Sequence, residues 1–342
     1  MERGSSATLD DYNSVVKGEF EMNLMVNSQM LFKKFSAKAR SWIKISRLHF
    51  YPMPWIAYSL GATAAYSMYR EFNLSIYVLG YVFLFLVELC SVLTNEYFDF
   101  KTDRQNKNSG FFNGGSRVLV ENRLVFKEVR TAIAVLLLLI LGTGYVLLKI
   151  SSDAKPVLML SFLFIGLFLG LGYTLPPLKF SYHGIGEIVV AVTFSPYLIL
   201  CGYVFQSGVW KDTFPWLITI PLLFAIFSAI TISGVPDFQA DRASKKRTIA
   251  VIFGPRIAII LSGICISVAA LSWIALYYFE ILKGWSVVLT FVVLLHALVL
   301  LTVLFKLMRS AHFDRKINRV MVLTLLYMLW FCLIPLLSLI LR

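Results

Sequence analysis

Two segments of this 342-residue chain place polar and acidic side chains four residues apart. The first contains Asn95, Asp99 and Asp103, and the second contains Asp237 and Asp241. Residues at this spacing lie on one face of an α-helix, where two like charges repel each other unless a cation lies between them. Magnesium prefers carboxylate oxygens and often completes its shell with substrate phosphates. Each segment is therefore a candidate half of a site for a magnesium-bound diphosphate.

Basic side chains accompany both acidic segments. Lys101 and Arg104 lie within the first segment, and Lys245, Lys246 and Arg247 follow the second. A diphosphate can be bound by magnesium on one side and by Lys or Arg on the other, so Lys246 is a candidate substrate-binding residue. One aspartate pair alone is more typical of a solvated helix end. Two pairs at equivalent helix ends, each with neighbouring cations, favour a diphosphate site.

Further candidates are expected on the same side of the molecule. Arg47 precedes the first apolar span, where it could bind substrate or anchor the chain to lipid headgroups. Residues 114–117 read Gly-Gly-Ser-Arg, and the glycines would let the backbone approach a ligand closely. The segment after the fourth apolar span contributes Tyr173 and Lys179. We therefore add Arg47, Arg117, Tyr173 and Lys179 to the candidate substrate-binding residues.

Two titratable residues have no firm assignment. Glu88 lies inside an apolar span, two helical turns before Asn95. A buried acid is costly in lipid and marks a functional hypothesis, although a contact with another helix would explain it equally well. His183 is a poor candidate metal ligand, because no second histidine is placed to help it.

The elements that position these residues are long apolar helices. Hydrophobic residues make up 58% of the chain and charged residues 15%, against roughly 25% charged residues in ordinary soluble domains. Many apolar runs reach the roughly 20 residues that cross a hydrocarbon core of about 30 Å. The sequence therefore predicts an all-α integral membrane protein. Hydropathy predicts nine spans at about 51–69, 74–97, 131–148, 156–175, 186–206, 213–235, 257–279, 285–305 and 320–341.

The distribution of Lys and Arg predicts the orientation of the bundle. With the N-terminus inside, 26 of the 32 Lys and Arg residues lie in inside segments. Cytoplasmic loops of membrane proteins carry such an excess, which also accounts for the net charge of +13 without nucleic acid as a partner. We therefore predict a cytoplasmic N-terminus, an outside C-terminus and motifs on the cytoplasmic side.

The N-terminal part of the chain differs from the rest. Residues 1–32 are polar and unpatterned, whereas residues 33–47 combine six Lys and Arg with apolar side chains such as Trp42. The second of these segments predicts a basic amphipathic helix on an anionic membrane surface. The chain is thus divided into a cytoplasmic tail, residues 1–47, and a lipid-embedded transmembrane domain, residues 48–342.

The two motifs together resemble those of the UbiA-type superfamily of intramembrane prenyltransferases. Asn95, Asp99 and Asp103 match the pattern Asn-x-x-x-Asp-x-x-x-Asp, and Asp237 and Asp241 match the second pattern, Asp-x-x-x-Asp. Both motifs together are quite specific for the superfamily and much less so for the acceptor.

The resemblance covers roughly residues 45–340 and extends to further segments. Lys246-Arg247-Thr248 is similar to the family's Lys-x-Thr-like tail. The family often shows Tyr-x-x-x-Lys after its fourth helix, whereas here Pro177 stands at the lysine position and the next lysine is Lys179. The resemblance implies a nine-helix bundle with a central cavity, capped at its cytoplasmic mouth by the motif loops. The four motif aspartates would hold Mg²⁺ on an isoprenyl diphosphate.

The resemblance also implies a reaction, namely transfer of the prenyl group to an aromatic acceptor in prenylquinone biosynthesis of the menaquinone or ubiquinone kind. The site would face the cytoplasm from the cell's inner membrane. Prenylation of haem, of a chlorophyll precursor or of a glycerol-phosphate lipid, and terpenoid cyclisation, remain open.

Two readings from other classes fit the sequence less well. A transporter with acidic gates would place polar residues near mid-membrane and break helices there, whereas this chain concentrates its polar groups at one face. A membrane scaffold without chemistry leaves the paired aspartates unexplained.

Overall fold

The computed structural model describes residues 9–106, 110, 113–151, 156–309 and 317–341, with side chains from residue 28 onward. Every regular element in this part of the chain is a helix. The helices are α1 (Leu9–Ser46), η1 (Leu48–Phe50), α2 (Pro52–Tyr69), α3 (Leu74–Phe98), α4 (Phe100–Gln105), α5 (Phe126–Ile150), α6 (Pro156–Gly172), η2 (Phe180–Tyr182), α7 (Gly186–Val192), η3 (Thr193–Tyr197), α8 (Leu198–Ser207), α9 (Thr213–Ser233), α10 (Phe238–Ala243), α11 (Ile249–Phe253), α12 (Pro255–Tyr278), η4 (Trp285–Leu289), α13 (Thr290–Met308) and α14 (Ile317–Ile340).

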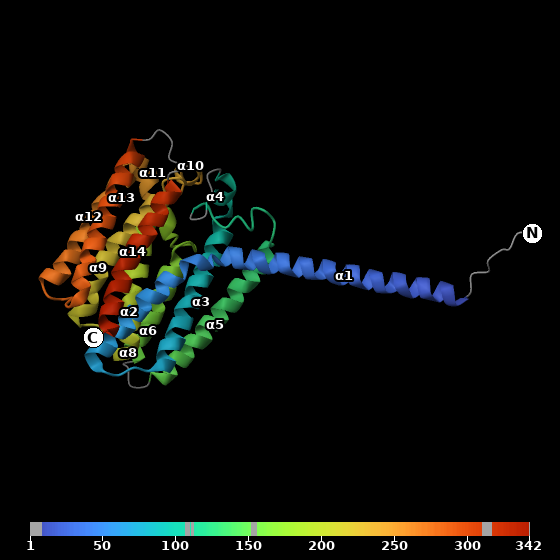
Figure 1. The fold of residues 1–342 in the computed structure, drawn as a ribbon, viewed down its shortest axis with the longest axis horizontal. Helices are drawn as coiled ribbons and strands as arrows, with labels where there is room; N and C mark the ends of the chain where they lie inside the picture. Colours follow the sequence, from blue (N-terminus) through green and yellow to red (C-terminus); the bar gives the residue numbers. More distant parts are fainter. Residues whose placement is uncertain (1–8, 107–109, 111–112, 152–155, 310–316, 342) are drawn as a thin grey trace, which may run out of the picture.

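The long helices pack side by side as a bundle, and the short helices α4, α10 and α11 gather at one end of it (Figure 1). Among the residues that the structure describes, seven helical segments are long and apolar enough to cross a membrane, so the chain is an integral multi-pass membrane protein. They are Leu74–Phe98, Phe126–Ile150, Gly186–Ser207, Thr213–Ser233, Pro255–Tyr278, Trp285–Met308 and Ile317–Ile340.

Two of the nine predicted spans do not belong to this set. α6 is an apolar helix of only 17 residues, and it ends at Gly172 instead of continuing to residue 175. α2 has 18 residues but is not among the helices that combine sufficient length and hydropathy. A count of nine spans therefore stays a prediction.

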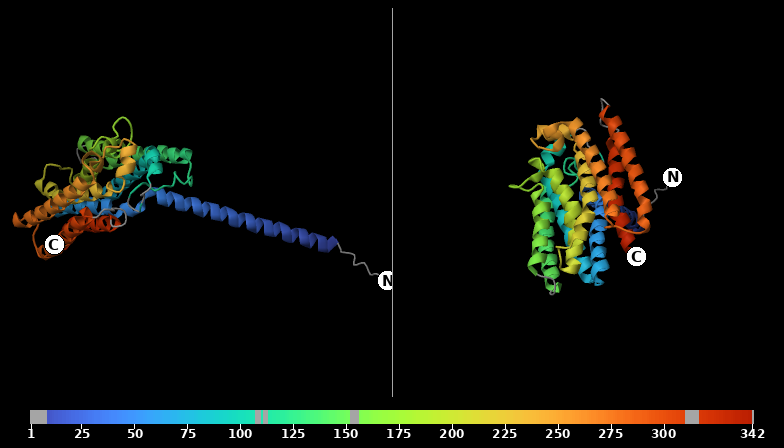
Figure 2. Two further views of the ribbon diagram at one scale, coloured as in Figure 1. Left: turned by 90° about the horizontal axis from the view of Figure 1, so that it is seen from above. Right: turned by 90° about the vertical axis from the view of Figure 1, so that its left-hand side faces the viewer.

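α1 runs away from the bundle as a single long helix (Figures 1 and 2). Residues 1–32 show no apolar pattern in the sequence, yet α1 begins at Leu9. No proline interrupts residues 9–46, and residues with high helix propensity such as Leu, Met, Lys and Glu recur there, so a polar helix can continue. At its bundle end, Lys38 pairs with Glu128 of α5.

Small residues bring α2 and α8 into backbone contact. A Cβ atom added to Gly61 would lie 1.8 Å from the Ile199 carbonyl oxygen, and one added to Gly202 would lie 2.0 Å from the Tyr58 carbonyl oxygen. Helices in lipid gain stability mainly from such close packing, since lipid tails are as apolar as the side chains. The contact fixes α2, whose first turn lies beside the site.

The predicted span at 186–206 is one helical segment with an irregular centre. α7 and α8 are joined by a π-helical stretch, η3, which contains Pro196. Proline cannot donate the usual backbone hydrogen bond, so a local widening of the helix is expected there. Thr193 and Phe194 of η3 line the central cavity described below.

Candidate active site

The two motifs keep the one-face arrangement that their spacing predicts. The amide of Asp99 donates to the Asn95 carbonyl at 2.8 Å, and the amide of Asp103 donates to the Asp99 carbonyl at 2.9 Å. The helical hydrogen bonding therefore continues across the junction of α3 and α4. In the second motif, the amide of Asp241 likewise donates to the Asp237 carbonyl at 2.9 Å.

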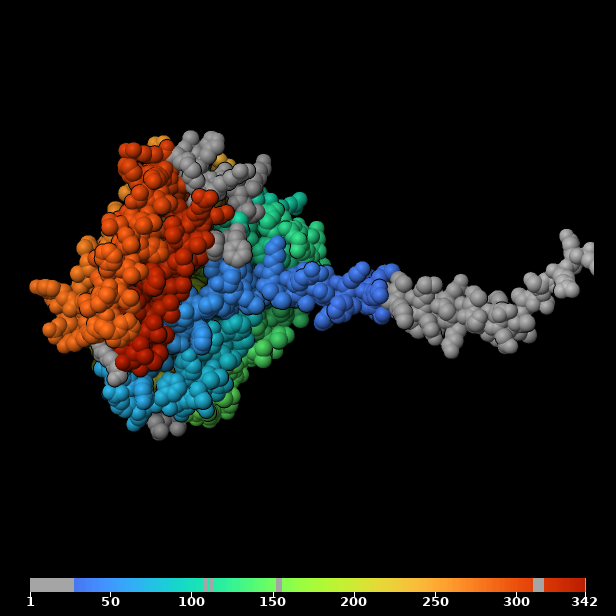
Figure 3. Space-filling model, in the orientation of Figure 1, coloured from blue at the N-terminus to red at the C-terminus, as the bar shows by residue number. Residues whose placement is uncertain are grey.

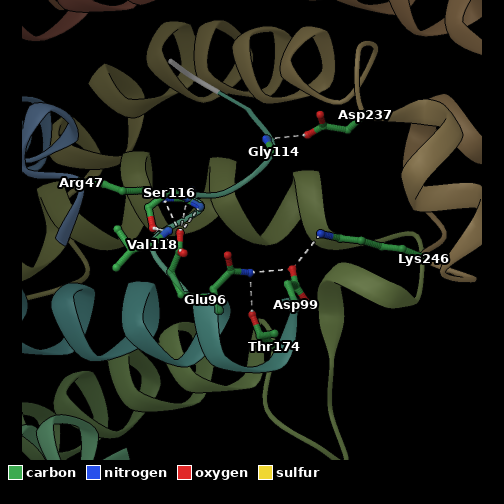
Figure 4. Close-up of polar contacts among 10 residues, drawn as sticks. Arg47, Glu96, Asp99, Gly114, Ser116, Val118, Thr174, Asp237 and Lys246 are labelled. Atoms are coloured by element: carbon green, nitrogen blue, oxygen red, sulfur yellow. Dashed lines mark hydrogen bonds and ion pairs between the residues drawn. The ribbon is translucent and has the colours of Figure 1, made fainter. Parts of the chain in front are cut away.

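Asp99 is the centre of a buried network that joins both motifs. Its Oδ2 accepts from Asn95 Nδ2 at 2.9 Å and from Lys246 Nζ at 3.0 Å, and its Oδ1 accepts from the Tyr182 hydroxyl at 2.7 Å. Asn95 Nδ2 also reaches the Thr174 hydroxyl at 3.1 Å (Figure 4). The structure thus brings three predicted site residues, Asn95, Asp99 and Lys246, into direct contact.

Asp237 is held by the loop that follows the first motif. Its Oδ1 accepts from Asn106 Nδ2 at 2.7 Å and from Asn113 Nδ2 at 2.8 Å. Its Oδ2 accepts from the Gly114 amide at 3.3 Å (Figure 4). The two motif loops therefore meet at the same end of the bundle, although they lie more than 120 residues apart in the sequence.

The loop is fastened in turn by a buried ion pair between Arg47 and Glu96. Arg47 Nη2 lies 2.5 Å and Arg47 Nε 3.0 Å from Glu96 Oε1. The Ser116 amide donates to Oε1 at 2.7 Å, and its hydroxyl donates to Oε2 at 2.6 Å (Figure 4). Glu96, near the end of α3, therefore connects the segment before α2, through Arg47, with the loop after α4, through Ser116.

In the loop after α4, Gly115 brings the backbone close to the Asp103 side chain rather than to open space. Gly115 has a φ of +72°, and a Cβ atom added there would lie 2.1 Å from Asp103 Oδ2. Only glycine can adopt this backbone conformation without cost and leave room for the carboxyl group. Nearby, Arg117 Nη1 donates to the carbonyls of Asp103 and Asn106, each at 3.1 Å, so this part of its guanidinium holds α4.

Burial and mutual repulsion act on the carboxyl groups. Burial raises the pKa of Asp103 to about 7, helped by the charge of Glu96. Burial also raises the pKa of Asp241 to about 7, although Lys246 opposes this shift. Burial tends to lower the pKa of Lys246, but the charges of Asp99 and Asp241 outweigh it and raise that pKa. The cluster therefore places several acidic groups around Lys246.

The carboxyl groups do not form a ready metal site. In the described part of the chain, no three His, Cys, Asp or Glu side chains gather as a group that could hold a metal ion. Asp99 and Asp237 are instead occupied by amide, hydroxyl and ammonium donors. Magnesium is often bound through only one or two carboxylates plus substrate phosphates. The donor set, with carboxylates in excess of nearby cations, suits such a shared ion.

The segment between α6 and α7 supplies aromatic and cationic groups. The Tyr182 ring has Lys179 Nζ at 5.1 Å and Lys246 Nζ at 5.6 Å from its centroid. Tyr173 lines the cavity below the motifs. Of the predicted residues, Lys179 therefore lies beside Lys246 at the same ring.

His183 and Glu187 have structural roles. His183 forms an isolated parallel β-bridge with Arg247, and its Nδ1 lies 2.9 Å from the Lys179 carbonyl oxygen. Glu187 is buried and accepts from the Ile249 amide at 2.8 Å, at the start of α11. His183 attaches the segment before α7, and Glu187 the first turn of α7, to the segment after the second motif.

An apolar cavity of about 310 Å³ begins at Asn95 and Tyr173 and extends into the bundle between α2, α3, α6, α9 and α14. Leu84, Val190 and Met328 are typical of its lining. The surface is hollowed between α2 and α14 (Figure 3). The bundle therefore offers apolar space directly beneath the polar cluster.

Several residues of this site were not predicted from the sequence. They are Glu96, Asn106, Asn113, Ser116 and Tyr182. Each is a common polar residue whose partner is distant in sequence, so spacing gives no signal. Only the position of Glu96 inside the first motif could have marked it.

Replacing Glu96 by Ala is expected to destabilise the protein by about 3 kcal/mol, because it leaves the Arg47 guanidinium partly buried without its counter-charge. The thermal unfolding midpoint of the detergent-solubilised protein would measure this effect. Glu121→Ala is the control, because its ion pair with Arg123 lies at the surface and contributes at most about 1 kcal/mol. Equal midpoints for the two variants would show that the Glu96 network does not hold the loop.

Comparison with known proteins places the chain in a family. The UbiA prenyltransferase family matches residues 55–326. A UbiA prenyltransferase domain-containing protein 1 from Xenopus tropicalis is 24% identical over 68% of this chain and 65% of its own length. The 2-carboxy-1,4-naphthoquinone phytyltransferase of Synechocystis sp. is 24% identical over 65% of this chain and 68% of its own length. The chain thus spans about two thirds of these relatives.

A solved structure shares the fold. The structure of a UbiA homolog from Archaeoglobus fulgidus bound to GPP and Mg²⁺ superposes with a TM-score of 0.58 and 17% identity, covering 86% of this chain and 99% of that one. The family match covers most of the chain, including both aspartate motifs. The chain therefore belongs to the UbiA prenyltransferase family.

Proposed function

We propose that this protein transfers the prenyl group of an isoprenyl diphosphate to an aromatic acceptor in a Mg²⁺-dependent reaction of prenylquinone biosynthesis. One observation carries the proposal: both aspartate motifs converge on Lys246 directly above an apolar cavity. A diphosphate needs the polar end, and a prenyl chain needs the apolar space. The naphthoquinone phytyltransferase relative supports the aromatic acceptor, and the homolog bound to GPP and Mg²⁺ supports the donor and the metal.

The polar cluster would bind and stabilise the diphosphate. Asp99, Asp103, Asp237 and Asp241 would hold the metal, which when bound neutralises charge on the departing diphosphate. Lys246 would add a cationic contact from the same side, where preorganised charge is most effective in a water-poor site. The predicted substrate contacts of Arg117 and Lys179 belong to this proposal. Arg117 has further N–H donors beyond those used on α4.

The apolar cavity would orient the reacting carbon and exclude water. In the transfer, the C–O bond between the prenyl carbon and the diphosphate breaks while a C–C bond to the aromatic ring forms. The ring releases one proton, so the products are the prenylated ring, diphosphate and a proton. The Tyr173 and Tyr182 rings near the polar end could stabilise a cation-like prenyl carbon through cation–π contacts. Arg47 is engaged by Glu96 and would act on substrate indirectly.

The proposal includes a membrane arrangement. A cytoplasmic tail, residues 1–47, would precede a transmembrane domain, residues 48–342, with nine spans and the site on the cytoplasmic face of the cell's inner membrane. The strong inside excess of Lys and Arg supports this orientation. The transporter alternative loses support, because the chain belongs to a prenyltransferase family.

Cysteine labelling tests the orientation. Cysteines introduced at Glu121 and Arg242, both exposed, are expected to react with an impermeant thiol reagent only from the cytoplasmic side. A cysteine at the exposed Lys283 should react only from the opposite side. The four native cysteines are buried and form the background control. Labelling of Glu121→Cys and Arg242→Cys from opposite sides would overturn the layout.

Magnesium dependence is the second test. Geranyl diphosphate is expected to raise the unfolding midpoint of the purified protein only when Mg²⁺ is present, because the carboxyl groups repel an unshielded diphosphate. At a ligand concentration of about 100 Kd the stabilisation would be about 2.7 kcal/mol. Excess EDTA should abolish it, and excess Mg²⁺ should restore it. Undiminished stabilisation in EDTA would contradict the shared metal.

The third test asks whether the two motifs serve one site. Asp99→Ala and Asp237→Ala should each lower turnover by about 100-fold or more at saturating Mg²⁺, because each removes stabilisation of the departing charge. Product formation from labelled prenyl diphosphate and an acceptor panel, followed by mass spectrometry, measures the effect and also separates the possible acceptors. Glu121→Ala, which is exposed and outside either motif, should retain its activity. Near-normal turnover in both aspartate variants would refute the two-motif site.

A further inference from the structure

The apolar cavity contains an acidic side chain that the proposed reaction does not use. Glu88 lies in α3 and lines the cavity together with Leu84 and Val92. Within the described part of the chain, its carboxyl group has no hydrogen bond or ion pair. An acidic group without a partner is costly in the apolar interior of a membrane bundle, so a carboxyl group kept on this cavity wall calls for a ligand.

A second polar group without a partner belongs to a residue of the cavity wall. The Tyr51 hydroxyl is buried and has no hydrogen-bond partner among the described residues. Tyr51 lines the cavity, and its ring packs against Phe85 with the centroids 4.9 Å apart. Glu88 lies close enough to act electrostatically on Tyr51, although the two are not hydrogen-bonded. The cavity thus offers a hydroxyl donor near a carboxyl acceptor.

Several other polar groups of the cavity wall are already engaged. Ser91 Oγ donates to the Gly170 carbonyl at 2.6 Å, and Arg47 is paired with Glu96. Asn95 is bound to Asp99 at the polar end. Glu88 lies seven residues before Asn95, about 10 Å along the helix, so it is well below the diphosphate end.

We propose that Glu88 and Tyr51 form the recognition site for a hydroxyl group on the acceptor, an inference that rests on the proposed function. A hydroxyl group can donate to the Glu88 carboxyl group and accept from the Tyr51 hydroxyl, which satisfies both groups at once. A methyl ether cannot donate, and a carboxylate at the same place would face an acidic side chain. The acceptor is therefore a hydroxylated aromatic compound whose hydroxyl group points away from the motifs. Glu88 acts here as a specificity-determining, positioning residue.

A matched ligand pair tests the inference on the full-length, detergent-solubilised protein. We expect 1-naphthol to bind the wild-type protein at least about 10-fold more tightly than 1-methoxynaphthalene, because a site built for a hydroxyl group rejects the analogue without a donor. The shift of the unfolding midpoint with ligand concentration gives each apparent Kd. Detergent takes up each ligand equally in every sample, so variant-to-wild-type ratios are independent of it.

The variants are Glu88→Leu, Glu88→Gln and Tyr51→Phe, with the exposed Glu121→Gln as control. Glu88→Leu should weaken 1-naphthol binding about 10-fold or more and leave the ether unaffected. Glu88→Gln and Tyr51→Phe should lose part of the preference, and Glu121→Gln none. The Gln variant keeps the size of the side chain and guards against a folding defect in the Leu variant.

The outcomes separate this inference from the proposed function. Equal affinity of the wild-type protein for the two ligands, including no measurable binding of either, overturns the inference. Unchanged 1-naphthol binding in both Glu88 variants also overturns it. Geranyl diphosphate with Mg²⁺ should stabilise wild type and Glu88→Leu alike, and its failure to stabilise the wild type would instead count against the proposed function.

Discussion

Carboxyl groups buried at one end of an apolar bundle require positive charge or hydrogen-bond donors nearby, and the arrangement of this site follows from that requirement. Lys246 supplies the positive charge next to Asp99, from 147 positions away in the sequence. Two asparagine side chains and a backbone amide supply the hydrogen-bond donors for Asp237. Some of these donors cross between the motifs: Lys246, which follows the second motif, donates to Asp99 of the first, and the loop after the first motif donates to Asp237 of the second. The two halves of the site therefore hold each other in place.

The need of buried charges for partners also explains which residues occur in the loops that cap the site. Glu96 is buried and offers its charge to Arg47 and to Ser116, so the loop after α4 is attached to the start of the bundle. Gly115 lets that loop pass against Asp103 in a conformation that side chains disfavour. Lys246 approaches Asp99 from the other loop. Polar contacts fix the capping loops, whereas helix packing fixes the cavity walls.

Helix α3 both packs in the bundle and carries residues of the candidate site. Its lower part packs in the apolar interior, and its end carries Asn95 and Asp99 into the polar cluster. Glu88 occupies the space between these regions, on the cavity wall. A single helix can thus relate an apolar pocket, a recognition group and a charged site at fixed spacings, since its rise per residue is constant at about 1.5 Å. Such rigidity suits a reaction that must align two substrates.

The sequence by itself determined the membrane character, most helix positions and the one-face arrangement of the aspartates. Hydropathy and the 3.6-residue period are local properties, so Asn95, Asp99 and Asp103 could be grouped without knowing the fold. The tertiary structure decided which groups meet. Tyr182, Asn106 and Asn113 reach their aspartates across tens to more than a hundred residues, and no local pattern encodes those pairings. It also decided that Glu187 fastens a loop, because the burial of a side chain depends on neighbours that sequence spacing does not reveal.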